Sequence, residues 1–120
     1  MKYSNLALPA LLIIAILPAS LSAQLPNALR QKEVFRNDDV VFHQIDSVTW
    51  VGTGHDMYNE SMYLVEGTDK ALLIDAGTNI KDLDKIVASI TAKPVMVVAT
   101  HVHPDHTGPS INVFPEVCIN

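Results

Sequence analysis

The sequence predicts an α+β fold in which an antiparallel-rich mixed sheet carries a covering helix. Several short runs rich in β-branched and aromatic residues are separated by turn residues, as in sheets made of successive strands. Between residues 79 and 94, apolar residues recur at helical spacing. The continuous apolar run at residues 95–100 then predicts a buried strand. A chain of 120 residues has room for one small domain.

Residues 1–23 have the pattern of a secretory signal peptide. A single lysine near the start precedes the almost wholly apolar stretch 6–17, and small residues follow up to Ala23. The apolar stretch is shorter than the roughly 20 residues that a spanning helix needs, and Pro9 interrupts it. We therefore favour cleavage after Ala23 over a membrane anchor. This predicts an exported protein, periplasmic or extracellular, with no stable membrane insertion after cleavage.

The first strands are predicted after a polar N-terminal arm. Residues 24–39 mix charged and amide residues with scattered apolar ones, which indicates an arm that is loosely docked. Residues 40–45 and 47–51 are better strand candidates, because they are rich in β-branched and aromatic types. We therefore expect the domain to occupy residues 40–120 and to begin with antiparallel pairing.

A hairpin is the clearest secondary-structure prediction. Residues 61–66 and 71–75 are two apolar runs, and the segment between them holds Gly67 and Asp69. Two such runs joined by a short segment with glycine and aspartate are typical of a β-hairpin.

The predicted helix follows this hairpin. Its apolar positions share a spacing of three or four residues: Ile80, Leu83, Ile86, Val87 and Ile90. Asn79 is the expected N-cap, and Pro94 is the expected stop. The helix leads into the buried strand, and residues 111–114 begin a further element.

Three histidines and an aspartate lie within six residues directly after the buried strand. If the extended conformation continues, His101 and His103 project from the same face and can share one ion. Asp105 and His106 are adjacent and follow the strand-breaking Pro104, so they suit a second ion a few ångströms away. Paired zinc ions are a recurrent hydrolytic arrangement. A closed structural zinc site is disfavoured because such sites typically use cysteines, and Cys118 is the single cysteine.

The motif HVHPDHTG at residues 101–108 resembles the HxHxDH signature of the metallo-β-lactamase superfamily. The segment LLIDAGT at residues 72–78 resembles the superfamily's strand-ending aspartate and glycine motif. The resemblance spans residues 48–108 and departs from the pattern at Pro109, where many members have a second glycine.

This resemblance implies an αββα sandwich of which the chain is the N-terminal half. It also implies two Zn²⁺ ions and the hydrolysis of an ester, lactone, thioester or β-lactam bond in a small-molecule substrate by a metal-activated water. The superfamily's remaining metal ligands would lie beyond residue 120. We therefore expect residues 40–120 to be a partial domain, truncated at its C-terminus.

Three further residues have predicted roles. Asp105 is a candidate proton shuttle as well as a ligand, and hence the candidate catalytic residue. By resemblance, Asp75 orients a histidine ligand or its loop from behind the metal ligands, but it could equally be a turn-forming aspartate before Gly77. His55 lies in a glycine-flanked loop that could reach the substrate, or it is simply solvated.

Charge and ligand number leave two functional hypotheses open. The formal charge of −5, without basic clusters, argues against nucleic acid as a partner. Cys118 stands alone in a strand-like stretch, which indicates a buried, inert thiol.

Catalytic zinc normally has three protein ligands plus water, whereas His101 and His103 provide only two ligands for one ion. The alternative to a hydrolase is therefore a non-catalytic fragment that binds metal weakly or not at all.

Overall fold

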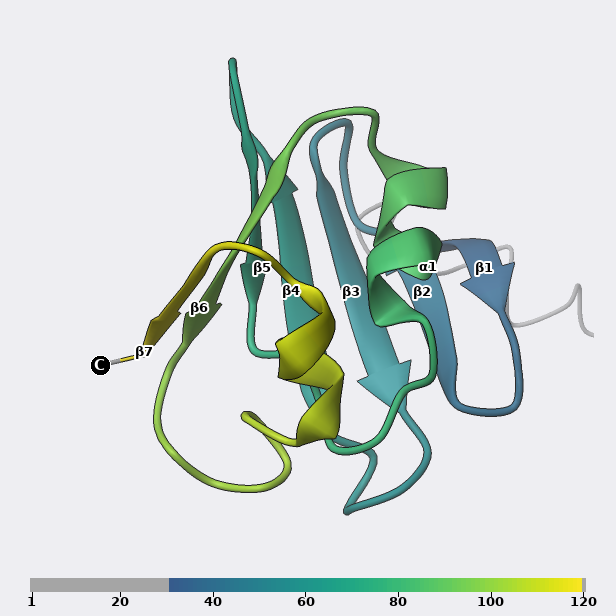
Figure 1. Ribbon diagram of the computed structural model, residues 1–120. Coiled ribbons are helices and arrows are strands. Elements are labelled where there is room, and N and C mark those ends of the chain that lie inside the picture. Colours follow the sequence, from purple (N-terminus) through teal and green to yellow (C-terminus); the bar gives the residue numbers. More distant parts are fainter. Residues whose placement is uncertain (1–30, 120) are drawn as a thin grey trace, which may run out of the picture.

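The computed structural model describes residues 31–119, which form a mixed seven-stranded sheet with one α-helix (Figure 1). The strands follow one another in the sheet in sequence order: β1 (Lys32–Arg36), β2 (Val40–Gln44), β3 (Thr49–Gly54), β4 (Ser61–Glu66), β5 (Ala71–Ile74), β6 (Val95–Ala99) and β7 (Val117–Ile119). The helix α1 (Leu83–Ile90) connects β5 to β6, and the 3₁₀ helix η3 (Pro109–Val113) connects β6 to β7. The predicted signal peptide lies outside the described residues.

The sheet changes from antiparallel to parallel at β5. Strands β1 to β5 pair antiparallel with their neighbours, whereas β5–β6 and β6–β7 pair parallel. The predicted hairpin is confirmed as β4 and β5, in which Tyr63 lies opposite Ile74. The predicted antiparallel-rich mixed sheet is also confirmed, and α1 forms the crossover that a parallel pair requires.

The sheet begins earlier than the predicted domain boundary at residue 40. Within the predicted arm, Lys32–Arg36 forms the edge strand β1, which pairs with β2. Four of its five residues are exposed, and Phe35 is partly buried against the core. Backbone pairing holds this strand in place while most of its side chains face solvent, so its sequence lacks the alternation that marks a half-buried strand.

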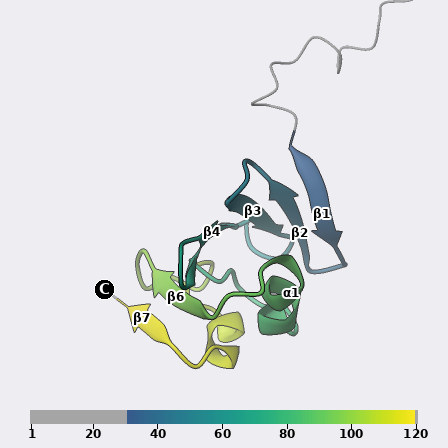
Figure 2. The ribbon, with the colours of Figure 1, turned by 90° about the horizontal axis from the view of Figure 1, so that it is seen from above.

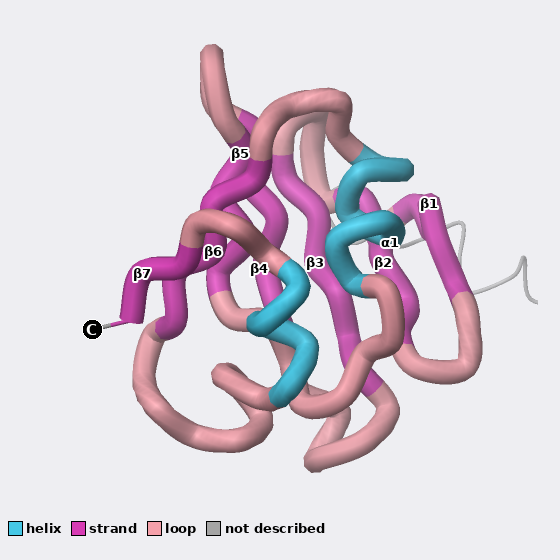
Figure 3. The backbone as a smooth tube through the Cα atoms, viewed as in Figure 1, coloured by secondary structure: helices cyan, strands magenta, loops and turns pink. Residues whose placement is uncertain are grey.

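The hydrophobic core lies between the sheet and the helical segments. Figures 1 and 2 show α1 and η3 on one face of the sheet, and Figure 3 shows the loops that join each of them to the strands. Fully buried side chains from the strands and α1 belong to one cluster, among them Phe42, Met62, Leu64, Leu73, Leu83 and Val87. Burying each such side chain contributes about 1.5–3 kcal/mol to folding. The second half of a sandwich stays a prediction.

The helix α1 starts later than its apolar spacing predicts. Asn79 is not the N-cap; that position is Asp82, which is left-handed at φ 54° and makes no side-chain cap bond. The amide of Ile80 already donates to Ser110 Oγ at 2.6 Å, and that of Lys81 donates to Asp39 Oδ2 at 3.1 Å. Because the left-handed Asp82 cannot continue a right-handed helix, residues 80 and 81 stay outside it, and these long-range bonds satisfy their amides instead. At the other end, the helix stops before Pro94, as predicted.

Two other local predictions need correction. The element expected at residues 111–114 is part of the 3₁₀ helix η3. Cys118 does lie in a strand, but β7 is at the edge of the sheet and the thiol residue is exposed rather than buried. Within residues 31–119, no helix has the length and apolar character needed to cross a membrane.

Strands β3, β5 and β6 all end at the same edge of the sheet, which is formed by strand ends rather than by an outer strand. Because β3 and β5 are both antiparallel to β4, they run in the same direction, and β6 runs parallel to β5. The residues that follow them are His55, Asp75 and Thr100, respectively. The pairing of the sheet therefore gathers at one edge segments that are far apart in the sequence.

Candidate metal centre

The loop after β6 is fastened to the segment that follows β5. The amide of Ala76 donates to the carbonyl of His106 at 3.0 Å, and the amide of Gly108 donates to the carbonyl of Gly77 at 3.1 Å. Gly108 packs so closely that a Cβ atom there would overlap the carbonyl of Thr78. Glycine is needed for this close backbone approach. The loop that carries the histidines is thus held against a neighbouring part of the sheet.

His101 and His103 meet by a different route from the one predicted. The strand ends at Ala99, and residues 100–102 form a bend, so the extended conformation does not continue through the two histidines. Even so, His101 Nε2 lies 3.0 Å from His103 Nδ1, with the ring centroids 4.5 Å apart. The tight turn after the strand brings the rings together, and both residues are exposed.

Asp105 and His106 form a second pair beside the first. The carboxylate oxygen Oδ2 of Asp105 lies 3.2 Å from His106 Nε2. Both side chains are partly buried, at 27% and 22% exposure for Asp105 and His106. The rings of His101 and His106 have centroids 4.1 Å apart, so the two pairs adjoin one another.

Asp75 lies behind this cluster and contacts it directly. The residue is 5% exposed, and its carboxylate Oδ2 accepts a hydrogen bond from His106 Nδ1 at 2.8 Å. Its other oxygen, Oδ1, accepts from the backbone amide of Thr100 at 2.8 Å. Asp75 is also left-handed, at φ 63°, a conformation that aspartate tolerates better than most residues. The structure therefore gives it both the geometry of a turn aspartate and a contact to a histidine.

The side-chain atoms that face each other in both pairs are of the kind that can bind a cation. A carboxylate can only accept, so His106 donates its Nδ1 proton to Asp75. With its proton on Nδ1, a neutral His106 would offer the lone pair of Nε2 to a cation beside the Asp105 carboxylate, whose Oδ2 is 3.2 Å away. Two ligands of one tetrahedral zinc ion lie about 3.3 Å apart, given Zn–N distances of about 2.0–2.1 Å. The separations in both pairs are close to this value.

Each pair nevertheless offers only two protein ligands. Among residues 31–119, no group of three or more histidine, cysteine, aspartate or glutamate side chains is arranged to hold one ion. The chemistry and spacing of the donors fit zinc, whereas the number of ligands falls short of the three that catalytic zinc normally takes.

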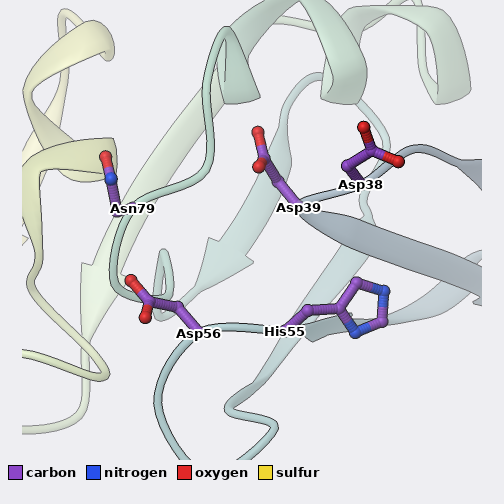
Figure 4. A pocket seen from close by; sticks show the side chains of 5 residues that line it. All are labelled: Asp38, Asp39, His55, Asp56 and Asn79. Atoms are coloured by element: carbon purple, nitrogen blue, oxygen red, sulfur yellow. The ribbon is translucent and has the colours of Figure 1, made fainter.

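His55 lies in a separate polar hollow at the same edge of the sheet. It is exposed, and its backbone amide donates to the carbonyl of Asp39 at 3.0 Å. Figure 4 shows it with the other residues that line a cavity of about 240 Å³: Asp38, Asp39, Asp56 and Asn79. Among the described residues, no hydrogen bond joins its ring to the histidine cluster. Its predicted role toward a substrate stays a prediction.

Sequence reasoning missed three polar residues that organise this edge. Glu60 is 6% exposed, and its carboxylate accepts from the amides of Met57 at 3.1 Å and Thr78 at 3.0 Å. Ser110 accepts from the amide of Ile80, and Thr100 contacts Asp75. The position of Thr100 directly before the first histidine was a usable signal. Glu60 and Ser110 had none, since the bonds from Thr78 to Glu60 and from Ile80 to Ser110 join residues far apart in the chain.

The mixed sheet thus carries a loop of histidines and an aspartate beside the ends of two neighbouring strands, and the spacing of the paired side chains fits zinc. Residues 55–110 match the family model of the metallo-beta-lactamase superfamily, and this confirms the resemblance found in the two motifs. The matched segment runs from the loop after β3 into η3 and is similar to that superfamily. The superfamily generally binds zinc. No curated protein matches the chain.

Proposed function

We propose that this chain provides part of the zinc site of a hydrolase that cleaves an ester, lactone, thioester or β-lactam bond. The observation that carries the proposal is the arrangement of His106. Its Nδ1 is bound to the buried Asp75, and its Nε2 faces Asp105 beside the pair formed by His101 and His103. Such an outer carboxylate is the usual means of orienting a histidine ligand toward a metal.

The residues divide into two proposed ion positions. His101 and His103 would hold one ion, and Asp105 and His106 would hold the second. Zinc, when bound, supplies a Lewis acid and lowers the pKa of a coordinated water toward about 7. Asp105 is partly exposed, so its carboxylate can exchange a proton with solvent or with a leaving group. The exposed rings of His101 and His103 leave this side of the cluster open to a small-molecule substrate.

The wider setting belongs to the same proposal. The sheet and α1 would form one half of an αββα sandwich, with α1 in its covering layer, and further ligands would complete each ion's set. The N-terminal segment supports an exported, periplasmic or extracellular protein. The acidic composition supports a small-molecule substrate rather than nucleic acid, and no membrane partner is proposed after signal cleavage.

Metal analysis and a substrate panel test this proposal together. A form of the protein that carries those further ligands, dialysed and then measured by elemental analysis, is expected to retain about two zinc ions. It should also hydrolyse at least one of a β-lactam, a lactone and a thioester, and chelation should abolish the activity. Retention of no zinc by folded protein would refute the proposal, as would hydrolysis that survives complete removal of the metal.

One observation favours the alternative of a non-catalytic chain. Within residues 31–119 each donor pair has two ligands, and no larger group is arranged around one point. A chain of this kind would bind metal weakly or not at all. Competition with a chelator of known affinity separates the two hypotheses, because a two-ligand site should lose zinc to a chelator that leaves a three-ligand site occupied.

A further inference from the structure

Thr100 lies between the buried carboxylate and the first histidine of the cluster. Its hydroxyl Oγ1 is 2.9 Å from Asp75 Oδ2 and 3.1 Å from Asp75 Oδ1. The same hydroxyl lies 3.0 Å from His101 Nδ1. The backbone amide of Thr100 donates to Asp75 Oδ1, which fixes the distance between the two residues.

The protons available to these groups allow one arrangement. A carboxylate only accepts hydrogen bonds, so the single hydroxyl proton of Thr100 goes to Asp75. The Thr100 oxygen must then accept from His101, which therefore carries its proton on Nδ1. A neutral His101 is left with an unprotonated Nε2, the atom that faces His103 Nδ1 at 3.0 Å.

We propose that Thr100 is a positioning residue through which Asp75 sets the tautomer and ring orientation of His101. Asp75 already sets those of His106 directly, by accepting from its Nδ1. The buried carboxylate of Asp75 thus sets the tautomer and ring orientation of one histidine in each pair, those of His106 by direct contact and those of His101 through the Thr100 hydroxyl. The relevance to zinc rests on the function proposed above, whereas the tautomer itself is a property of the metal-free chain.

The sheet explains why a hydroxyl can act as this link. Strands β5 and β6 are parallel neighbours, with Ile74 opposite Val98, so the residues just beyond their ends meet at the same edge. Thr100 is β-branched, which restricts its χ1 rotamers and helps to keep the hydroxyl between its two partners. Removing that hydroxyl should disturb His101 and leave the direct bond between Asp75 and His106 in place.

Imidazole ¹⁵N chemical shifts of the metal-free full-length protein provide the test. Spectra are recorded at a pH at which the ring ¹⁵N shifts show the neutral form, so that tautomers of neutral rings are compared. The wild type should show His101 protonated on Nδ1. Thr100→Val, which removes the hydroxyl at nearly constant shape, should shift His101 toward a mixture of tautomers while His106 is unchanged. Thr100→Ser should restore the wild-type pattern.

Thr107→Val is the matched control. Thr107 lies in the same loop, but its hydroxyl donates to the backbone carbonyl of His103 and contacts no ring. It should leave the tautomer of His101 unchanged. If Thr100→Val does not fold, as judged by urea unfolding, Thr100→Ala takes its place. In a zinc titration, the affinity of one of the two proposed ion positions should fall about tenfold or more in the variant without the hydroxyl. This is within the range usual for a residue that contacts a metal ligand rather than the metal.

The outcomes separate this inference from the function on which it rests. A His101 tautomer that is unchanged in Thr100→Val would overturn the inference even if zinc binding is normal, as would an equal change in Thr107→Val. A tautomer that changes as expected supports the positioning role, even in a protein that binds no zinc. A protein with the expected tautomers that binds no zinc would refute only the proposed hydrolase function.

Discussion

His106 Nδ1 lies 2.8 Å from Asp75 Oδ2, although the two residues are 31 positions apart in the chain. The contact forms because β5 and β6 are parallel neighbours and because the loop after β6 folds back onto the segment after β5. It places a buried carboxylate behind a cluster of side chains that can bind metal. Three of the four predictions below concern side chains at this edge of the sheet.

Asp75→Asn should weaken zinc binding at both proposed ion positions. The amide keeps the shape of the carboxylate but loses its charge and presents an NH₂ group to one of its present donors. The zinc affinity of the full-length protein should fall by about 10–100-fold, as is typical when an outer partner of a ligand is changed. Competition with a chelator measures the effect. Asp69→Asn, in the exposed turn between β4 and β5, is the control and should bind zinc like the wild type.

His103→Ala should be more severe than any change at Asp75. It removes a proposed ligand from a pair that has only two in the described chain, so metal and hydrolysis should be lost together. Activity on a β-lactam, a lactone and a thioester should fall by orders of magnitude. Excess zinc should rescue Asp75→Ala more than His103→Ala.

His43→Ala controls for the loss of a histidine as such, because His43 lies in β2 and contacts Glu33 rather than the cluster. The assignment of His103 as a ligand fails if hydrolysis survives in folded His103→Ala protein.

Glu60→Ala should destabilise the fold. The carboxylate is buried and accepts two backbone amide protons, those of Met57 and Thr78, which would lose their partner. A buried donor left unsatisfied costs about 1–3 kcal/mol, so the free energy of unfolding in urea should drop by at least that amount. Glu116→Ala is the control: its ion pair with Lys70 is exposed, and such pairs are worth about 0–1 kcal/mol. Equal effects of the two substitutions would contradict a structural role for Glu60.

The exported protein should begin near Gln24. This follows from the short apolar stretch, its interruption by Pro9 and the small residues before the predicted cleavage point. N-terminal sequencing of the protein recovered outside the cytoplasm measures the start directly. Recovery of Met1 in a membrane fraction would instead support an uncleaved anchor.

Local patterns in the sequence were enough to predict the hairpin of β4 and β5, the strand β6 and the approximate helix, although only Val97 and Ala99 of β6 are buried. They also identified the side chains that gather in the loop after β6, since His101, His103, Asp105 and His106 are close neighbours in the chain. Such features depend on side-chain periodicity and short-range spacing, which a single sequence displays directly. The sequence prediction missed the edge strand β1 and wrongly expected Cys118 to be buried, because both features depend on a strand's place in the sheet.

Contacts between distant segments were decided only by the folded sheet. The N-cap of α1 is Asp82 rather than the predicted Asn79, because Asp82 is left-handed and the amides of residues 80 and 81 bond to Ser110 and Asp39. The orientation of His106 by Asp75 likewise depends on two strand ends that meet through parallel pairing. Residue types and their spacing indicate which side chains can bind a metal. The direction in which a ring nitrogen points is set instead by hydrogen bonds to residues tens of positions away, and local periodicity does not reveal those partners.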